Sequence, residues 1–449
     1  MKKMTKLWIA VVVLTLLCVT MFASCTGAGE VLESSGMKFE PVKGGYKVVS
    51  IGLCTDRNLV IPAEYEGVSV VSIESGAFKD NKNLISVTIP ETVTTINSNA
   101  FENCIALTTV NFSSGLKTLG SEVFAGCTSL SKITLPEKLT TIGDNVFKGC
   151  TSLKEIDVDE YNVKFVFEDG VLYSADKKQL IKVFGSAADF VIPSTVTTIK
   201  GGAFRGFDDL TTITIPASVK TIGAAAFENC VALESVTFAG NNVTTLGNYA
   251  FAGCSALASV KLPTSGLTTV GNYAFSNCTS LKSITVTSSV KKLGDGAFMG
   301  CTALESVKLP TAIDQIGSYQ FMNCASLKTV DIPANIYKIG TSAFYACRSL
   351  TTVKFDSVKE IGVAAFASCT ALTTMSIPSK VTTVGQRAFA DCVKLTKVSV
   401  PEGVTTMDYR VFEGCTALTE VACKAEVQPE SWNVEWLGIE STTIAQFGK

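Results

Sequence analysis

Cysteine is the residue of this chain whose number and spacing could do the most chemistry. The sequence has sixteen cysteines and no histidine. Such a set could form disulfides, bind metal ions or supply thiolate nucleophiles. Twelve of the cysteines recur at intervals of about 23 residues, namely Cys104, Cys127, Cys150, Cys230, Cys254, Cys278, Cys301, Cys324, Cys347, Cys369, Cys392 and Cys415.

The regular spacing favours a structural role for these cysteines. If the recurring segments stack, the cysteines align in one column, where each serves as a small buried hydrophobe. Asn81 and Phe207 occupy the same position in two segments, so sulfur is not required there. Disulfides between neighbouring coils are the alternative, and a metal array is a weaker one because the chain has no CxxC pair. We expect no metal site and no cofactor.

Carboxylate pairs are the remaining candidates for catalysis in a chain without histidine. Glu155 and Asp157 are the only acidic pair on one predicted strand face, and Asp159 with Glu160 extends the acidic run. A glycosidase needs two carboxylates across a groove at a defined separation. A cation site, a partner contact and a solvated edge are simpler interpretations. No phosphate-binding loop or nucleophile elbow is present, so we expect no catalytic residues and no enzyme activity.

A phenylalanine marks almost the same point in each recurring segment, and this repeat must position everything else. A fixed period in this range predicts a solenoid, in which each unit buries its apolar face only against its neighbours. The fourteen anchors are Phe78, Phe101, Phe124, Phe147, Phe204, Phe227, Phe251, Phe275, Phe298, Phe321, Phe344, Phe366, Phe389 and Phe412.

One repeat, 215–238, shows how a coil is built. Leu233, Val236 and Phe238 alternate with polar residues, which predicts a buried strand face. A second short strand follows at 219–222, and the alanines of 224–226 suit a brief helical or 3₁₀ turn that places Phe227 in the core. We therefore expect a repeat solenoid of short parallel strands and short helical or 3₁₀ turns around one continuous core.

The N-terminal residues are typical of an export signal. Lys2, Lys3 and Lys6 precede an apolar run over 7–21, too short for a membrane span. Small residues before Cys25 resemble the lipobox of bacterial lipoproteins, although Phe22 departs from the usual aliphatic residue. We expect lipid attachment at Cys25 and a membrane tether through it. Secretion without lipid and an uncleaved anchor are the alternatives.

We expect the chain to consist of five segments. A signal peptide covers 1–24, a tether 25–37, an N-terminal capping unit 38–75, repeats 76–422 and a C-terminal cap 423–449. An insertion at about 151–200 adds about 34 residues to one cycle, and its Asp169-Gly170 pair predicts a β-hairpin turn. The hairpin either decorates one coil or forms a contact loop. Trp432 and Trp436 are expected to cover the last core layer, with sugar binding as the alternative.

Units of the form I-P-x-x-V-x-x-I-G-x-x-A-F-x-x-C-x-x-L-x-x-V resemble the BspA-like leucine-rich repeats of bacterial cell-surface proteins. The resemblance covers about 38–449 and includes an entry unit with Tyr46, Ile61-Pro62 and Tyr65 and the hairpin at 169–173. It implies a right-handed leucine-rich-repeat superhelix with caps at both ends. It also implies surface exposure and binding of host or neighbouring-cell macromolecules, without naming a ligand.

The outward strand positions are the candidate binding residues. They include Thr109, Asn111, Lys132, Thr134, Glu155, Asp157, Lys261, Lys308, Asp331 and Lys354. The balance of 38 basic and 40 acidic residues leaves no nucleic-acid footprint. We expect a lipid-anchored, monomeric cell-surface protein that binds a protein ligand as an adhesin or interaction scaffold. A glycan-binding lipoprotein of the cell envelope and a structural envelope spacer are the alternatives.

Overall fold

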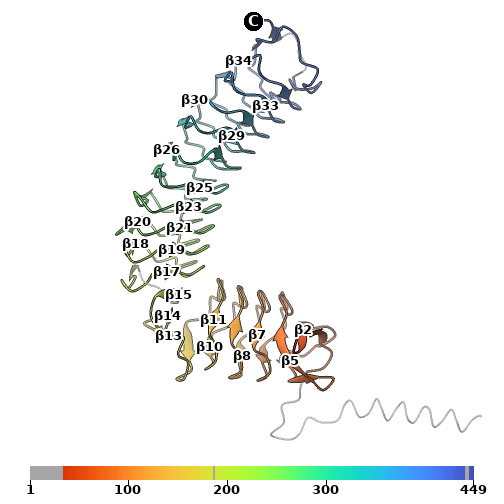
Figure 1. Ribbon diagram of the computed structural model, residues 1–449, viewed down its shortest axis with the longest axis vertical. Coiled ribbons are helices and arrows are strands. Elements are labelled where there is room, and N and C mark those ends of the chain that lie inside the picture. Colours follow the sequence, from red (N-terminus) through yellow and green to blue (C-terminus); the bar gives the residue numbers. More distant parts are fainter. Residues whose placement is uncertain (1–33, 186–187, 440–443) are drawn as a thin grey trace, which may run out of the picture.

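The computed structural model describes residues 34–185, 188–439 and 444–449, and these form a stack of coils (Figure 1). All regular elements longer than a single turn are β-strands within these ranges. No helix of the described residues is long and apolar enough to cross a membrane. The predicted solenoid of short parallel strands is confirmed, and each coil adds one strand to each of two parallel ladders.

The first-strand ladder runs along one face of the stack and carries the alternating segment of each repeat. In chain order its strands are Asn58–Val60 (β3), Ser86–Thr88 (β6), Thr109–Asn111 (β8), Lys132–Leu135 (β10), Glu155–Val158 (β12), Asp189–Val191 (β16), Thr212–Ile215 (β18), Ser235–Phe238 (β20), Ser259–Val260 (β22), Ser283–Thr285 (β24), Ser306–Lys308 (β26), Thr329–Asp331 (β28), Thr352–Lys354 (β30), Thr374–Ser376 (β32), Lys397–Val400 (β34), Glu420–Cys423 (β36) and Ala445–Phe447 (β37). Paired neighbours are parallel and join equivalent positions, as Ile213 does with Val236. The pairing is interrupted between β8 and β10, β12 and β16, β26 and β28, and β30 and β32.

The second-strand ladder consists of the short strands that precede the recurring glycines. Its strands are Val68–Ile73 (β5), Thr95–Ile96 (β7), Thr118–Leu119 (β9), Thr141–Ile142 (β11), Thr198–Ile199 (β17), Thr221–Ile222 (β19), Thr245–Leu246 (β21), Thr269–Val270 (β23), Lys292–Leu293 (β25), Gln315–Ile316 (β27), Lys338–Ile339 (β29), Glu360–Ile361 (β31), Thr383–Val384 (β33) and Thr406–Met407 (β35). At the N-terminal end Lys38–Val42 (β1), Gly45–Ser50 (β2) and Glu64–Tyr65 (β4) complete the first coil, with β2 paired to β5.

The third side of each coil, which we call the turn edge, is not helical, so the expected helical or 3₁₀ turn is wrong. Ala225 and Asn229 have φ of 55° and 59°, in the left-handed region, and this interrupts any right-handed helix. The N–H groups of Ala225, Phe227 and Asn229 donate to carbonyls of the next coil at 2.7–2.8 Å. Alternate residues therefore bond from coil to coil, and the residues between them close tight turns.

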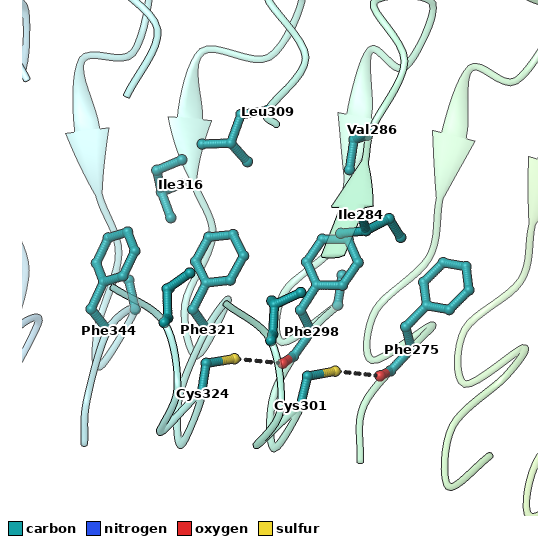
Figure 2. Packing of buried hydrophobic residues seen from close by; sticks show 14 of the residues in the cluster. Phe275, Ile284, Val286, Phe298, Cys301, Leu309, Ile316, Phe321, Cys324 and Phe344 are labelled. Carbon is teal, nitrogen blue, oxygen red and sulfur yellow. Dashed lines mark hydrogen bonds between the residues drawn. The ribbon is translucent and has the colours of Figure 1, made fainter. Parts of the chain in front are cut away.

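The anchor phenylalanines form two columns of stacked rings inside the coils. Successive rings within a column lie nearly parallel with centroids 4.7–6.3 Å apart, and Figure 2 shows the part of one column from Phe275 to Phe344. Thirteen of the fourteen anchors are fully buried, including Phe227 and Phe298. The sequence-based core assignment is confirmed.

The twelve column cysteines are buried, free thiols, each bonded to the coil before it. In every case the Sγ–H donates to the carbonyl oxygen of the anchor phenylalanine of the preceding coil, with Sγ–O distances of 3.0–3.2 Å. The bonds of Cys301 and Cys324 are visible in Figure 2. The thiol thus acts both as a small hydrophobe and as a donor to a buried carbonyl.

The two tryptophans near the C-terminus cover the last core layer, as predicted. Both are 3% exposed. The indole N–H of Trp432 donates to the carbonyl of Val404 at 3.0 Å. The ring of Trp436 meets that of Phe412 edge-on at a centroid distance of 6.2 Å. Their faces are therefore not offered to a sugar.

The insertion divides the stack, so the expectation of one continuous core is wrong at this point. Phe165–Glu168 (β13), Val171–Ser174 (β14) and Gln179–Val183 (β15) form an antiparallel sheet, and β15 continues into the second-strand ladder through β17. Leu172 and Ile181 pack into the core before the insertion, whereas Tyr173 and Leu180 pack into the core after it. The insertion is a shared wall between two cores.

The solenoid bends at this wall (Figure 1). On the turn edge the coils of Phe147 and Phe204 remain in contact, because Lys200 pairs with Asp144 at 2.7 Å and the Asn145 N–H donates to the carbonyl of Gly201. Neither strand ladder pairs directly across the insertion. The coils of Phe147 and Phe204 are therefore joined along the turn edge and held apart along both strand ladders, which tilts one coil relative to the other. The inserted sheet thus acts as a wedge.

Removing one central ring should cost a large part of the stability of its segment. We predict that Phe227→Ala lowers the free energy of unfolding by about 3–5 kcal/mol, because it leaves a cavity in a column that cannot collapse without moving its neighbours. Urea unfolding followed by circular dichroism measures this loss. Thr237→Ala, at an exposed position of β20, is the control. An equal stability of both variants would contradict the core assignment.

The buried thiols predict a loss of stability in alkali. Burial raises the pKa of eight column cysteines, to about 12 for Cys104, Cys150, Cys301 and Cys369. The pKa values of Cys254 and Cys392 are raised first by hydrogen bonds to Cys230 and Cys415 and then by burial. An unfolded thiol ionises near pH 8.5. The folded pKa is raised, so the stabilisation is complete below about pH 8 and is lost as the pH rises above about 9, by about 1.4 kcal/mol per pH unit for each thiol.

Urea unfolding between pH 7 and pH 10 under reducing conditions measures this slope. Cys324→Ala should reduce the slope by the contribution of one thiol, about 1.4 kcal/mol per pH unit. A free energy of unfolding that stays constant over this range would show that the thiols titrate equally in both states and are not buried.

Candidate partner-binding surface

The outward face of the first-strand ladder holds the residues that the sequence offers for binding. Nine of the ten are exposed and Asp157 is half-buried. Because equivalent positions pair in register, Lys132 lies beside Glu155, Thr134 beside Asp157, and Asp331 beside Lys354. Thr109 and Asn111 lie on β8, and Lys261 and Lys308 lie on later coils. The ten residues form a long strip and do not converge on one point. Cys25 lies outside the described residues.

The acidic run at the insertion is the most charged part of this strip. The Lys132 ammonium lies 2.7 Å from Asp157 and 3.9 Å from Glu155. The hydrogen bond to Asp157 raises the pKa of Lys132. The carboxylate of Asp159 accepts the N–H of Tyr161 at 2.9 Å and so closes a turn. Glu155 and Asp157 thus share one cation in the manner of a surface ion pair.

A cleft of about 480 Å³ separates β12 from the wedge. Glu155, Asp157 and Glu160 lie on one side of it and Val166 and Phe167 on the other. A second cleft of about 480 Å³ lies on the far side of the wedge, between β11 and β15, where Lys164 and Lys200 contribute. The sequence identified the acidic residues, but not the cleft beside them, because the cleft exists only where the wedge opens the stack.

Lys182 lies where β15 meets the turn edge of the next coil, and its role is structural. Its ammonium donates to the carbonyls of Gly202 and Arg205 at 3.3 and 3.5 Å, and it lines a cavity of about 230 Å³ with Cys150 and Phe207. Burial lowers the pKa of Lys182 to about 8. These bonds tie β15 to the turn edge of the next coil. No group of three or more Cys, Asp or Glu side chains is placed to hold a metal ion in the described ranges.

Three tyrosines on the turn edge are surface residues that the sequence-based search missed. Tyr249, Tyr273 and Tyr319 each stand two residues before an anchor phenylalanine, so their side chains lie along one line of the solenoid. Tyr249 and Tyr319 are 43% and 37% exposed. The expected binding residues all lie at outward strand positions. The repeat register alone could have found them, because three of four successive repeats carry tyrosine at one position.

The fold and its repeat pattern define the class of protein. The family model for the BspA type leucine rich repeat region matches residues 58–173, 183–305 and 291–419. This covers most of the chain, which therefore belongs to the BspA-type leucine-rich repeat family, and the resemblance inferred from the sequence is confirmed. A search of curated proteins found no match.

This chain is similar to solved structures of bacterial leucine-rich repeat proteins. A leucine-rich repeat protein from Bacteroides ovatus is 30% identical, with a TM-score of 0.53 over 94% of this chain and all of that one. A leucine rich cell surface protein from Faecalibacterium prausnitzii is 23% identical, with a TM-score of 0.41 over 89% of this chain and 96% of that one. The pneumococcal vaccine antigen PcpA is also 23% identical, with a TM-score of 0.44 over 77% and 74%.

The wedge should couple two separately folded cores. Leu172 is fully buried in the core before the insertion and Leu180 in the core after it. We predict that Leu172→Ala speeds amide hydrogen exchange mainly in residues 76–158 and that Leu180→Ala speeds it mainly in 198–300, with losses of about 2–5 kcal/mol each. Mass spectrometry of peptides locates the effect. Lys178→Ala, at an exposed position, is the control, and identical exchange maps for both leucine variants would refute the two-core description.

Proposed function

We propose that this chain is an exported, lipid-anchored surface protein that binds a protein partner along its solenoid and performs no catalysis. Membership of the BspA-type leucine-rich repeat family is the observation on which the proposal depends. The bulk of the chain serves to build a long, regular surface, and the buried cysteines are occupied by structural hydrogen bonds. A stack of this kind presents a surface more readily than an enclosed pocket.

The register of the first-strand ladder supports a role in macromolecular binding. Thr212, Ser235, Ser259, Ser283 and Ser306 pair in sequence across five coils, so one outward column continues over all of them. A specific protein interface buries about 800 Å² on each partner. A surface that spans many coils offers such an area without any rearrangement.

Attachment to the membrane is assigned to Cys25. The apolar run of signal-peptide length and the small residues before Cys25 support processing as a lipoprotein. Acyl chains on this cysteine would tether the solenoid to a membrane surface without a spanning helix. The polar residues that follow would separate the first coil from the lipid.

Glycan binding along the strand face is less well supported than protein binding. Stacking on sugar rings needs exposed aromatic faces, and the ten outward candidates are threonine, asparagine, lysine, aspartate and glutamate. Threonine and serine on a strand also satisfy β-propensity. A purely structural spacer would need no particular residues on this face and would show no specific partner.

Lipid attachment and surface display can be tested together on intact cells. We predict that cells fed labelled palmitate label the wild-type chain and not Cys25→Ala, and that protease added to intact cells releases the solenoid of the wild type. Cys54→Ala, in the first coil, is the control for loss of a cysteine elsewhere. Palmitate labelling that survives Cys25→Ala would refute the anchor, and full protection from protease would refute surface display.

A further inference from the structure

The position two residues before each anchor phenylalanine has an unusual backbone. In all fourteen repeats this residue has a φ between 51° and 68°. The left-handed region favours glycine and asparagine, and a bulky side chain there is strained. Asn99, Asn145 and Gly202 fit this preference, whereas Tyr249, Tyr273 and Tyr319 do not. Glu122, Arg387 and Arg410 depart from it as well, and each of these charged side chains forms an ion pair. The aromatic residues at this position all fall within four successive repeats.

The three tyrosines surround a pocket of about 460 Å³ that also contains Met299 and Met322. We call these five residues and the space between them the tyrosine pocket. The rings of Tyr249 and Tyr273 stack at a centroid distance of 5.1 Å. The next repeat has Gly296, and a Cβ there would collide with the Tyr273 ring. Glycine at this point lets the Tyr273 ring lie across the next coil.

The tyrosine pocket is uncharged between charged stretches of the same edge. Before it, the turn edge carries the ion pairs Lys79–Glu102, Lys148–Glu122 and Arg205–Glu228, and after it Arg387–Glu413. Glu228 is the one charged residue in the lining, and Arg205 already neutralises it at 2.6 Å. A charged ligand would lose hydration without gaining a free counter-charge. The pocket therefore matches an uncharged group.

The arrangement of the rings favours a protein segment over a sugar. Tyr249 covers one face of the Tyr273 ring and Gly296 the other, so a pyranose cannot lie flat on this central ring. The pocket also offers the more exposed rings of Tyr249 and Tyr319, tyrosine hydroxyls and two flexible thioethers. Tyrosine and methionine are enriched, and charged residues depleted, at the centre of protein interfaces, where tyrosine is a frequent hot spot. Methionine side chains adapt to varied apolar partners.

We propose that the tyrosine pocket is the anchor site of the solenoid and binds an uncharged aromatic or aliphatic segment of a protein partner. This assignment rests on the proposed function as a protein-binding scaffold and places the main contact on the turn edge, away from the strand-face residues. The charged turns on either side form the rim of that interface.

A random peptide library displayed on phage is the probe for this site. Panning on the immobilised full chain should select uncharged peptides rich in aromatic and aliphatic residues. The variant Tyr249→Asn/Tyr319→Asn should weaken the selected peptides at least tenfold, because it removes two anchors. Asparagine already occupies this position at Asn99 and Asn145, so the variant keeps the backbone, and its thermal unfolding is checked against the wild type.

The matched control changes three exposed lysines next to the second-strand ladder and leaves both the turn edge and the ten strand candidates intact. Lys220→Ala/Lys291→Ala/Lys359→Ala should bind the selected peptides as the wild type does. Three results would overturn the proposal. The library could yield charged peptides, the tyrosine variant could bind the selected peptides as well as the wild type does, or binding could be lost only in the lysine variant. Binding to neutral oligosaccharides on an array that is lost only in the tyrosine variant would assign the pocket to a glycan. Dimerisation of the chain that is lost only in the tyrosine variant would assign it to a second copy. Either result would also overturn the proposal.

The palmitate and protease experiments on intact cells test the proposed surface display separately from the tyrosine pocket. Peptide binding that depends on the tyrosines, combined with full protection of the chain from external protease, would retain the pocket and refute surface display. Surface display without any tyrosine-dependent peptide binding would refute the pocket alone.

Discussion

Each coil of this protein depends on the coil beside it to satisfy its buried polar groups. The turn edge places carbonyls of the backbone inside the stack, where an unbonded group would be costly. At twelve of the fourteen anchors the phenylalanine carbonyl accepts a hydrogen bond from the thiol of the next coil, as Phe275 does from Cys301. The N–H groups of the edge donate to the coil that follows. Period, cysteine column and ring column are consequences of this one constraint.

The same constraint explains why the insertion bends the molecule. The wedge supplies strands to one ladder only, through β15 and β17, and the turn edge keeps its contact through Lys200 and Asp144. The coils cannot remain parallel under both conditions. The bend in turn opens clefts on two sides of the wedge, beside Glu155 and beside Lys164. The interruption of the repeat thus creates clefts that uninterrupted coils would not have.

The sequence was sufficient for the features that follow from the period. Phe227 and Cys230 lie in the core because apolar residues at the repeat spacing align on the buried side of the stacked coils. Trp432 covers the end of the core because the last coil has no further repeat to bury its apolar side. The turn edge was missed because alanine-rich segments suggest helix, whereas Ala225 and Asn229 adopt left-handed conformations that only contact with the next coil stabilises. The two cores were missed because whether Leu172 and Tyr173 face one core or two depends on tertiary packing. The tyrosine pocket was missed because only strand positions were searched.

Native-state amide hydrogen exchange on the turn edge tests most directly whether the coils are held from neighbour to neighbour. The N–H groups of Ala225, Phe227 and Asn229 donate across to the next coil, so we expect them to exchange only through cooperative opening of neighbouring coils, with protection close to that of the strand amides of Ile213 and Val236. Exchange at rates typical of exposed turns, with the strands still protected, would contradict the central claim that the turn edge holds the stack together.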